Sequence, residues 1–171
     1  ISVVVGGAYS FHIAPISLTT TAGGTAQEFT VSLKDSSGNV VTALNNQAFF
    51  VSASNGGLVS LNGLNWSTQA VGYINAGLSS QTFYFQSNKS GSSNVLVSDT
   101  NPANGAEGLT DASATITVQP SGFSKLNIAA SNIQLIAGQP SSAMTVQALD
   151  QYNNLVNVSA PIAVLDGTGI N

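Results

Sequence analysis

The stretch QEFTVSLKDSSGNVV (residues 27–41) decides the fold, because SAMTVQALDQYNNLV (residues 142–156) matches it without a gap. The offset between the two is 115 positions (142 minus 27). In both stretches apolar and polar side chains alternate, and an Asp then precedes an Asn by four residues. A period of two is that of a β-strand with one buried face. The two stretches therefore predict the same strand and turn in two copies.

The turn that follows each strand has matching chemistry although its letters differ. Asp35 and Asp150 occupy equivalent positions, and an Asp at a turn can accept hydrogen bonds from N–H groups two or three residues further on. Gly38 and Asn153 are also equivalent, and both residue types tolerate a positive φ. We therefore expect one turn geometry in both copies.

The offset also fixes the extent of the repeat. Residues 1–7 match 116–122, so we expect 1–7 to be the last strand of a preceding repeat or a linker. Residues 8–122 then form one complete repeat, and 123–171 the first part of another. A repeat of this length is a whole domain. We expect the chain to be a window from a longer array; the alternative is that a neighbouring subunit supplies the missing strands.

Further alternating or apolar runs predict an all-β protein without helices. Gly, Asn, Ser and Pro clusters separate these runs, as expected for short antiparallel strands in a sandwich. The additional strands are expected at residues 10–14, 16–21, 48–54, 68–74, 81–86, 94–98 and 114–118.

An Ala-Gly segment stands before each copy, as AGG at residues 22–24 and as AGQ at 137–139. Together with the strand and the Asp-x-x-Gly-Asn turn, it resembles the bacterial Ig-like repeats of S-layer proteins and invasin-like adhesins. The resemblance covers the complete repeat and the partial one. It implies tandem antiparallel Ig-like β-sandwiches, with about seven strands per repeat and no catalytic residues.

The composition excludes several classes of function. Hydrophobic residues make up 43% of the 171 residues, enough for a core, but charged residues make up only 6%. Three Lys and no Arg argue against nucleic acid, which needs clustered positive charge. No Cys is available for a disulfide or a zinc thiolate site. No apolar run reaches the roughly 20 residues of a membrane span, so we expect no membrane insertion.

Catalytic chemistry has few candidate residues. The sole His is His12, in an expected strand, and Asn127 stands at the equivalent position of the second copy. A general base confined to one of two like modules is not expected, so we interpret His12 as structural or exposed. No G-x-S-x-G motif is present. The sequence predicts that the chain is not an enzyme and needs no organic cofactor.

Calcium is the one cofactor for which the sequence offers a candidate site. The segment 99–111 gathers carboxylate and amide oxygens, and Ca²⁺ takes six to eight oxygen ligands. The spacing differs from that of an EF-hand, and a long turn capped by Asx side chains remains the alternative interpretation. The candidate ligands are Asp99, Asn101, Asn104, Glu107 and Asp111.

Two kinds of residue in the sequence are candidates for attachment to sugars or contact with them. Asn65, Asn88 and Asn157 each begin an N-x-[ST] pattern and are candidate glycosylation sites. Trp66 is expected in a loop, where it either stacks on a sugar or covers the end of the sandwich.

The function predicted first is a structural segment of a secreted, self-assembling prokaryotic cell-surface protein, of the S-layer or surface-fibre type. An uncharged hydroxyl and amide surface suits packing against like subunits or neighbouring repeats. The alternatives are the stalk of a surface adhesin, and a spacer or carbohydrate-binding module of a secreted polysaccharide-degrading enzyme. Cell-surface glycans are further candidate partners. All of these interpretations place the chain outside the cell.

Overall fold

The computed structural model describes residues 6–129, 136–139 and 143–159. The chain divides into two compact units, Ile1–Pro120 (unit 1) and Ser121–Asn171 (unit 2). The described ranges consist of strands joined by turns and loops, so the predicted all-β class is confirmed. These ranges contain no helix that is long and apolar enough to cross a bilayer. The predicted limits of the repeats, at 7/8 and 122/123, stay predictions.

One sheet of unit 1 has four antiparallel strands in the order β1-β3-β7-β5. Strand β3 lies between β1 and β7, with Phe11 opposite Leu33 on one side and Phe29 opposite Phe83 on the other. The quoted stretch therefore begins with an inner strand of this sheet. The bounds are Ser10–Ala14 (β1), Gln27–Lys34 (β3), Ser80–Ser87 (β7) and Gly57–Ser60 (β5).

The other sheet of unit 1 has five strands in the order β2-β9-β8-β4-β6. Strands β2 and β9 pair in parallel, and the other pairs are antiparallel. The consecutive strands β1 and β2 belong to different sheets, so the chain crosses from one sheet to the other between them. The bounds are Ser17–Thr21 (β2), Gln47–Ala53 (β4), Gln69–Ile74 (β6), Gly91–Ser98 (β8) and Ala112–Gln119 (β9).

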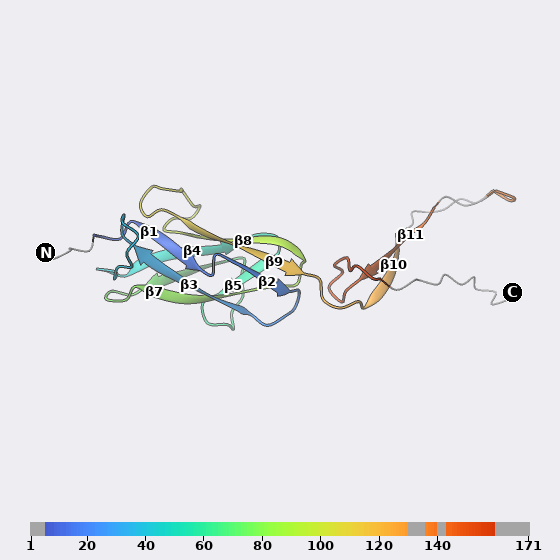
Figure 1. Ribbon diagram of the computed structural model, residues 1–171, viewed down its shortest axis with the longest axis horizontal. Helices are drawn as coiled ribbons and strands as arrows, with labels where there is room; N and C mark the ends of the chain where they lie inside the picture. Colours follow the sequence, from blue (N-terminus) through green and yellow to red (C-terminus); the bar gives the residue numbers. More distant parts are fainter. Residues whose placement is uncertain (1–5, 130–135, 140–142, 160–171) are drawn as a thin grey trace. The chain divides into compact units, whose positions relative to one another are not determined.

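The core of unit 1 lies between these two sheets, which Figure 1 shows layered one over the other. Buried and more exposed side chains alternate along β3, β7, β8 and β9, as the period of two predicts. Both sheets contribute fully buried side chains, among them Phe29, Leu33, Phe83, Phe85, Phe49, Val51, Ile74, Val95 and Ile116.

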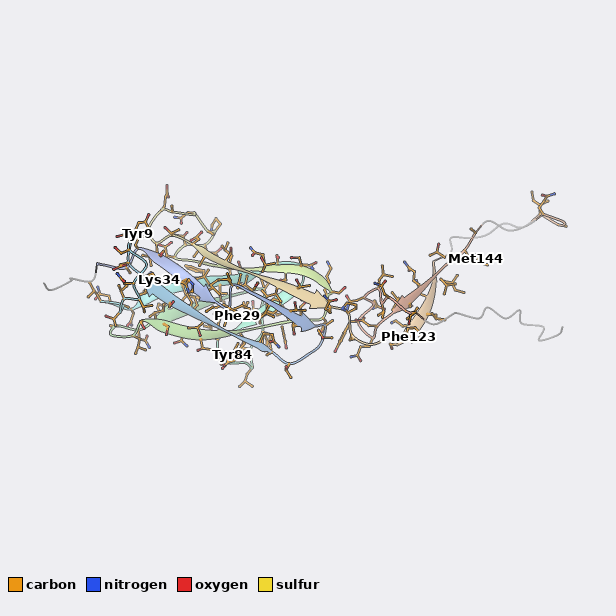
Figure 2. All side chains as sticks on the ribbon, viewed as in Figure 1. Tyr9, Phe29, Lys34, Tyr84, Phe123 and Met144 are labelled. Carbon is orange, nitrogen blue, oxygen red and sulfur yellow. The ribbon has the colours of Figure 1, made fainter. Side chains whose placement is uncertain are left out.

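An aromatic pair lies within this core. The rings of Phe29 and Phe83 stack with centroids 5.4 Å apart and an interplanar angle of 12°. Figure 2 labels Phe29 on β3, and Phe83 stands opposite it on β7. Such a pair adds about 0.5–1.5 kcal/mol to the stabilisation from area burial alone. The stack therefore fastens two neighbouring strands of the four-stranded sheet.

Strand β5 is the strand of unit 1 that the sequence did not predict. It begins at Gly57, within a run of Ser, Asn and Gly that reads as a turn. A Cβ at Gly57 would lie 2.5 Å from the ring of Phe85 and 2.8 Å from Oγ of Ser93. Gly is needed here because core side chains approach the strand closely. Gly57 thus makes the sequence of β5 resemble a turn, and it also allows β5 to pack against the core.

In its described part, unit 2 is an antiparallel pair of β10 (Lys125–Ala129) and β11 (Thr145–Leu149). Leu126 lies opposite Ala148, as Phe11 lies opposite Leu33 in unit 1. Both members of the pair are displaced by 115 positions (126 minus 11, 148 minus 33). The repeat seen in the sequence is therefore also a repeat of strand register.

The equivalent apolar positions differ in exposure between the units. Phe11 and Ile13 are 4% and 1% exposed, whereas Leu126 and Ile128 are 47% and 60% exposed. Met144, labelled in Figure 2, is also exposed. Within its described residues, unit 2 thus has the apolar face of a sandwich without the second sheet that covers this face in unit 1.

We expect Phe83→Ala to lower the free energy of unfolding of unit 1 by about 3–5 kcal/mol, because it removes buried area and leaves a cavity against Phe29. Val71→Ala, at a half-exposed position on β6, is the control and should cost less than about 1 kcal/mol. Urea unfolding followed by circular dichroism measures both losses. Equal losses for the two variants would contradict the packing described.

Candidate functional site

The carboxylate of Asp35, in the turn after β3, accepts four hydrogen bonds within the described residues. Its Oδ1 accepts the N–H groups of Ser37 (3.0 Å) and Asn39 (2.8 Å). Its Oδ2 accepts the side-chain amide of Asn39 (3.1 Å) and the N–H of Gly6 (3.4 Å). Gly38 has a φ of +83°, as the turn requires. The expected Asx turn is present, with a fourth donor from a distant residue.

Asp150 repeats this arrangement in unit 2. Its Oδ1 accepts the N–H groups of Tyr152 and Asn154, both at 2.8 Å. Its Oδ2 accepts the side-chain amide of Asn154 (2.8 Å) and the N–H of Ser121 (2.9 Å). Asn153 has a φ of +71° in place of the glycine. Every donor of Asp150 stands 115 positions after its counterpart in unit 1 (for example, 121 minus 6).

Both carboxylates are inaccessible and charged. Asp35 is 5% exposed and Asp150 is 0% exposed. Burial alone would raise the pKa of Asp150, but hydrogen bonds from Asn154, Ser121 and Tyr152 outweigh it and lower this pKa to about 2. The side-chain and backbone hydrogen bonds of Asn39, with smaller ones from Ser37 and Gly6, lower the pKa of Asp35 against the effect of burial.

The carboxylate in this turn therefore serves to bind N–H groups of the chain itself. Each carboxylate oxygen already accepts two hydrogen bonds, and an ion would have to displace them. The donors Gly6 and Ser121 lie 29 residues before their aspartates, just ahead of residues 8 and 123, where the sequence predicts that each repeat begins. One side chain thus ties the segment that enters a repeat to the turn after β3 in unit 1 or after β11 in unit 2. We call this arrangement the aspartate clamp.

The segment 99–111 connects β8 to β9. Oδ2 of Asp99 accepts the N–H of Leu109 at 2.9 Å, and Oδ2 of Asp111 accepts the N–H of Gly105 at 3.0 Å. The second oxygen, Oδ1, of both aspartates is buried and has no hydrogen-bond partner in the described residues. A buried carboxylate oxygen without a partner is costly, and a cation would satisfy it.

The other candidate ligands of this segment, Asn101, Asn104 and Glu107, are exposed. In the described part of the chain, no three His, Cys, Asp or Glu side chains gather closely enough to hold a metal ion. A calcium site here would therefore rely on amide, backbone or water oxygens beside the two aspartates. Calcium at this loop stays a prediction.

The remaining candidates are distributed over unrelated elements. His12 lies on β1 opposite Ser32 and is half-buried. The glycosylation candidates Asn65, Asn88 and Asn157 are all exposed, as a modified residue must be, and their modification stays a prediction. Trp66 lies in the loop between β5 and β6 and is half-buried.

Comparisons with known proteins give similarity only to solved structures. No family model and no curated protein matches the chain. Domains 1–6 of the surface layer protein SbsC share 18% identity with a TM-score of 0.45, over 87% of this chain and 17% of that one. A glycosyl hydrolase family 2 member from Bacteroides cellulosilyticus shares 18% identity with a TM-score of 0.48, over 67% and 15%.

A chaperone–tip adhesin complex of CFA/I fimbriae shares 13% identity with a TM-score of 0.42, over 81% of this chain and 66% of that one. The chain thus spans less than a fifth of the S-layer structure that it resembles. All three similarities have TM-scores below 0.5, too low to transfer a function.

We expect Asp35→Asn to be less stable than the parent at neutral pH, because the amide cannot accept at both of its terminal atoms. The pKa of Asp35 is lowered in the folded state, so its contribution to stability is complete above the unfolded value of about 3.9. That contribution is lost as the pH falls through the folded-state pKa. The stability difference between parent and variant should therefore shrink below about pH 4.

Urea unfolding of both proteins from neutral pH to about pH 2 measures this difference. Glu28→Gln removes an exposed carboxylate from the same strand, β3, and is the matched control, for which a small, pH-independent change is expected. A constant difference between the parent and Asp35→Asn over the whole range would contradict the aspartate clamp as a source of stability.

Proposed function

We propose that the chain is a non-catalytic structural segment of a secreted, self-assembling prokaryotic cell-surface protein, of the S-layer or surface-fibre type, built from tandem Ig-like domains. The observation that carries this proposal is the recurrence of the aspartate clamp, donor for donor, at an offset of 115 positions. A hydrogen-bonding arrangement that holds the backbone and recurs in both repeats fits a protein whose role is structural. Its partners are like subunits or neighbouring repeats.

The outer face of the five-stranded sheet supports self-association. Strands β2, β9 and β8 lie side by side, with Ser17 opposite Thr115 and Thr115 opposite Asn94. We call the exposed side chains of these strands the hydroxyl face: Ser17, Thr19, Thr21, Ser92, Asn94, Ser113, Thr115, Thr117 and Gln119. A face without charge neither repels a copy of itself nor carries the desolvation cost of buried ions.

We expect the purified chain to form ordered sheets or fibres in negative-stain micrographs, and Thr117→Lys to abolish them. A lysine near the middle of the hydroxyl face would place like charges in register between copies. Ser36→Lys, in the exposed turn after β3, adds the same charge away from this face and should leave assembly intact. Dispersed single particles of the parent protein would contradict self-assembly and favour the alternative that the chain is the stalk of an adhesin.

Calcium at the segment 99–111 is a second part of the proposal, supported by the two buried Oδ1 atoms without partners. We expect calcium to raise the Tm of unit 1 and a chelator to lower it, with the effect lost in Asp99→Asn. Glu28→Gln removes one carboxylate elsewhere and should keep the response. Calorimetry with calcium, magnesium and chelator measures these changes in Tm. The same Tm under all three conditions would contradict a calcium site and favour a turn capped by Asx side chains.

A further inference from the structure

A hollow of about 290 Å³ lies beside the loop that joins β5 to β6. This volume is at the lower end of the roughly 300–1,000 Å³ of small-ligand pockets, and so suits a single ring better than an extended molecule. The loop leaves one edge of the four-stranded sheet and enters an edge of the five-stranded sheet. The hollow is lined by Leu61, Asn62, Asn65, Trp66, Ser67 and Ala70.

The loop is held rigidly by its own polar groups. Oδ1 of Asn62 accepts the N–H groups of Leu64 (2.9 Å) and Asn65 (3.0 Å), and also the hydroxyl of Ser60 (3.1 Å). At the base of the loop, the backbones of Val59 and Ser67 exchange two hydrogen bonds, at 2.7 and 3.1 Å. A preformed wall loses little conformational entropy when a ligand binds.

These bonds also fix what the hollow offers to a ligand. Since Oδ1 of Asn62 accepts two backbone N–H groups, its side-chain NH₂ must point away from them, as a donor. Asn65, also exposed, contributes a second carboxamide, and Trp66 contributes a flat apolar ring. A flat ring with amide groups at its margin is suited to a ligand that has one apolar face and polar edges.

The residues that line the hollow carry no charge. Residues 36–88, which include all of β4, β5, β6 and β7, contain no Asp, Glu, Lys, Arg or His. The chain as a whole has a net charge of −4. The lining offers no cation to an anion such as a phosphate or an acidic sugar, and no carboxylate to a cation. The ligand that fits is therefore neutral.

We propose that this hollow is a binding site for a neutral sugar ring, which stacks the C–H groups of one face on the indole of Trp66. The carboxamides of Asn62 and Asn65 then hydrogen-bond the ring hydroxyls. This proposal adopts the sugar-stacking interpretation of Trp66 over the covering one that the sequence also leaves open. The site gives an otherwise structural module a means of contacting glycans, and it does not depend on self-assembly.

Trp66 is the only Trp in the chain, so its fluorescence reports directly on this site. The experiment titrates the full chain, made in a host without N-glycosylation, with maltotriose, cellotriose, mannotriose and chitotriose. Intact mass confirms that Asn65 is unmodified, which separates a free glycan from one attached to the chain. We expect at least one of these neutral trisaccharides to change the emission of Trp66 in a saturable way.

Variants test whether the indole itself binds. Calorimetric titration should show the affinity reduced by about tenfold or more in Trp66→Ala and by less in Trp66→Phe, which keeps an aromatic face. Tyr9→Ala removes a 55% exposed aromatic ring outside the hollow and should bind as the parent does. Thermal unfolding verifies that each variant is folded, and the parent titration stands even where Trp66→Ala is not.

Three results would overturn the proposal. The first is the absence of a saturable response to every neutral trisaccharide. The second is binding that survives unchanged in folded Trp66→Ala. The third is tighter binding of 3′-sialyllactose than of lactose and the neutral trisaccharides, since an uncharged hollow has no group that favours a carboxylate.

Discussion

Each repeat depends on one carboxylate that is buried, charged and fully bonded. Removing a charged group from water is costly unless its oxygens find donors, and four donors meet Asp35 and Asp150. Three of them come from the turn itself, and the fourth comes from the segment that enters the repeat. A single side chain thus links the entering segment to the turn that follows β3 in unit 1 and β11 in unit 2.

The sandwich of unit 1 is consistent with this constraint. Strand β3, whose end carries Asp35, pairs with β1 on one side and with β7 on the other. The stack of Phe29 on Phe83 joins β3 to β7 inside the core. Because apolar packing supplies the cohesion, the outer surface is free to be almost uncharged. Both self-association and the binding of neutral sugars depend on this nearly uncharged surface.

The loops at the sheet edges divide the remaining chemistry. The segment 99–111 contains two aspartates, each with a buried oxygen that has no hydrogen-bond partner in the described residues. The unsatisfied groups of this segment are therefore anionic. The loop between β5 and β6 is held by the hydrogen bonds that Asn62 accepts, and Trp66 lies there beside uncharged amides, so the lining of its hollow is neutral. Under the two proposals, one module is stabilised by a cation at one loop and contacts a sugar at another.

The sequence by itself determined the all-β class, the repeat, most strands and the Asx turns, because these are encoded by alternation or by hydrogen bonds spanning two to four residues. Only the tertiary structure decided the rest. It revealed β5, which Gly57 disguises, and the donors Gly6 and Ser121, which lie 29 residues from their acceptors. It also formed the hollow beside Trp66. Packing, rather than local pattern, brings distant segments together, and no periodicity in the chain reports which segments will meet.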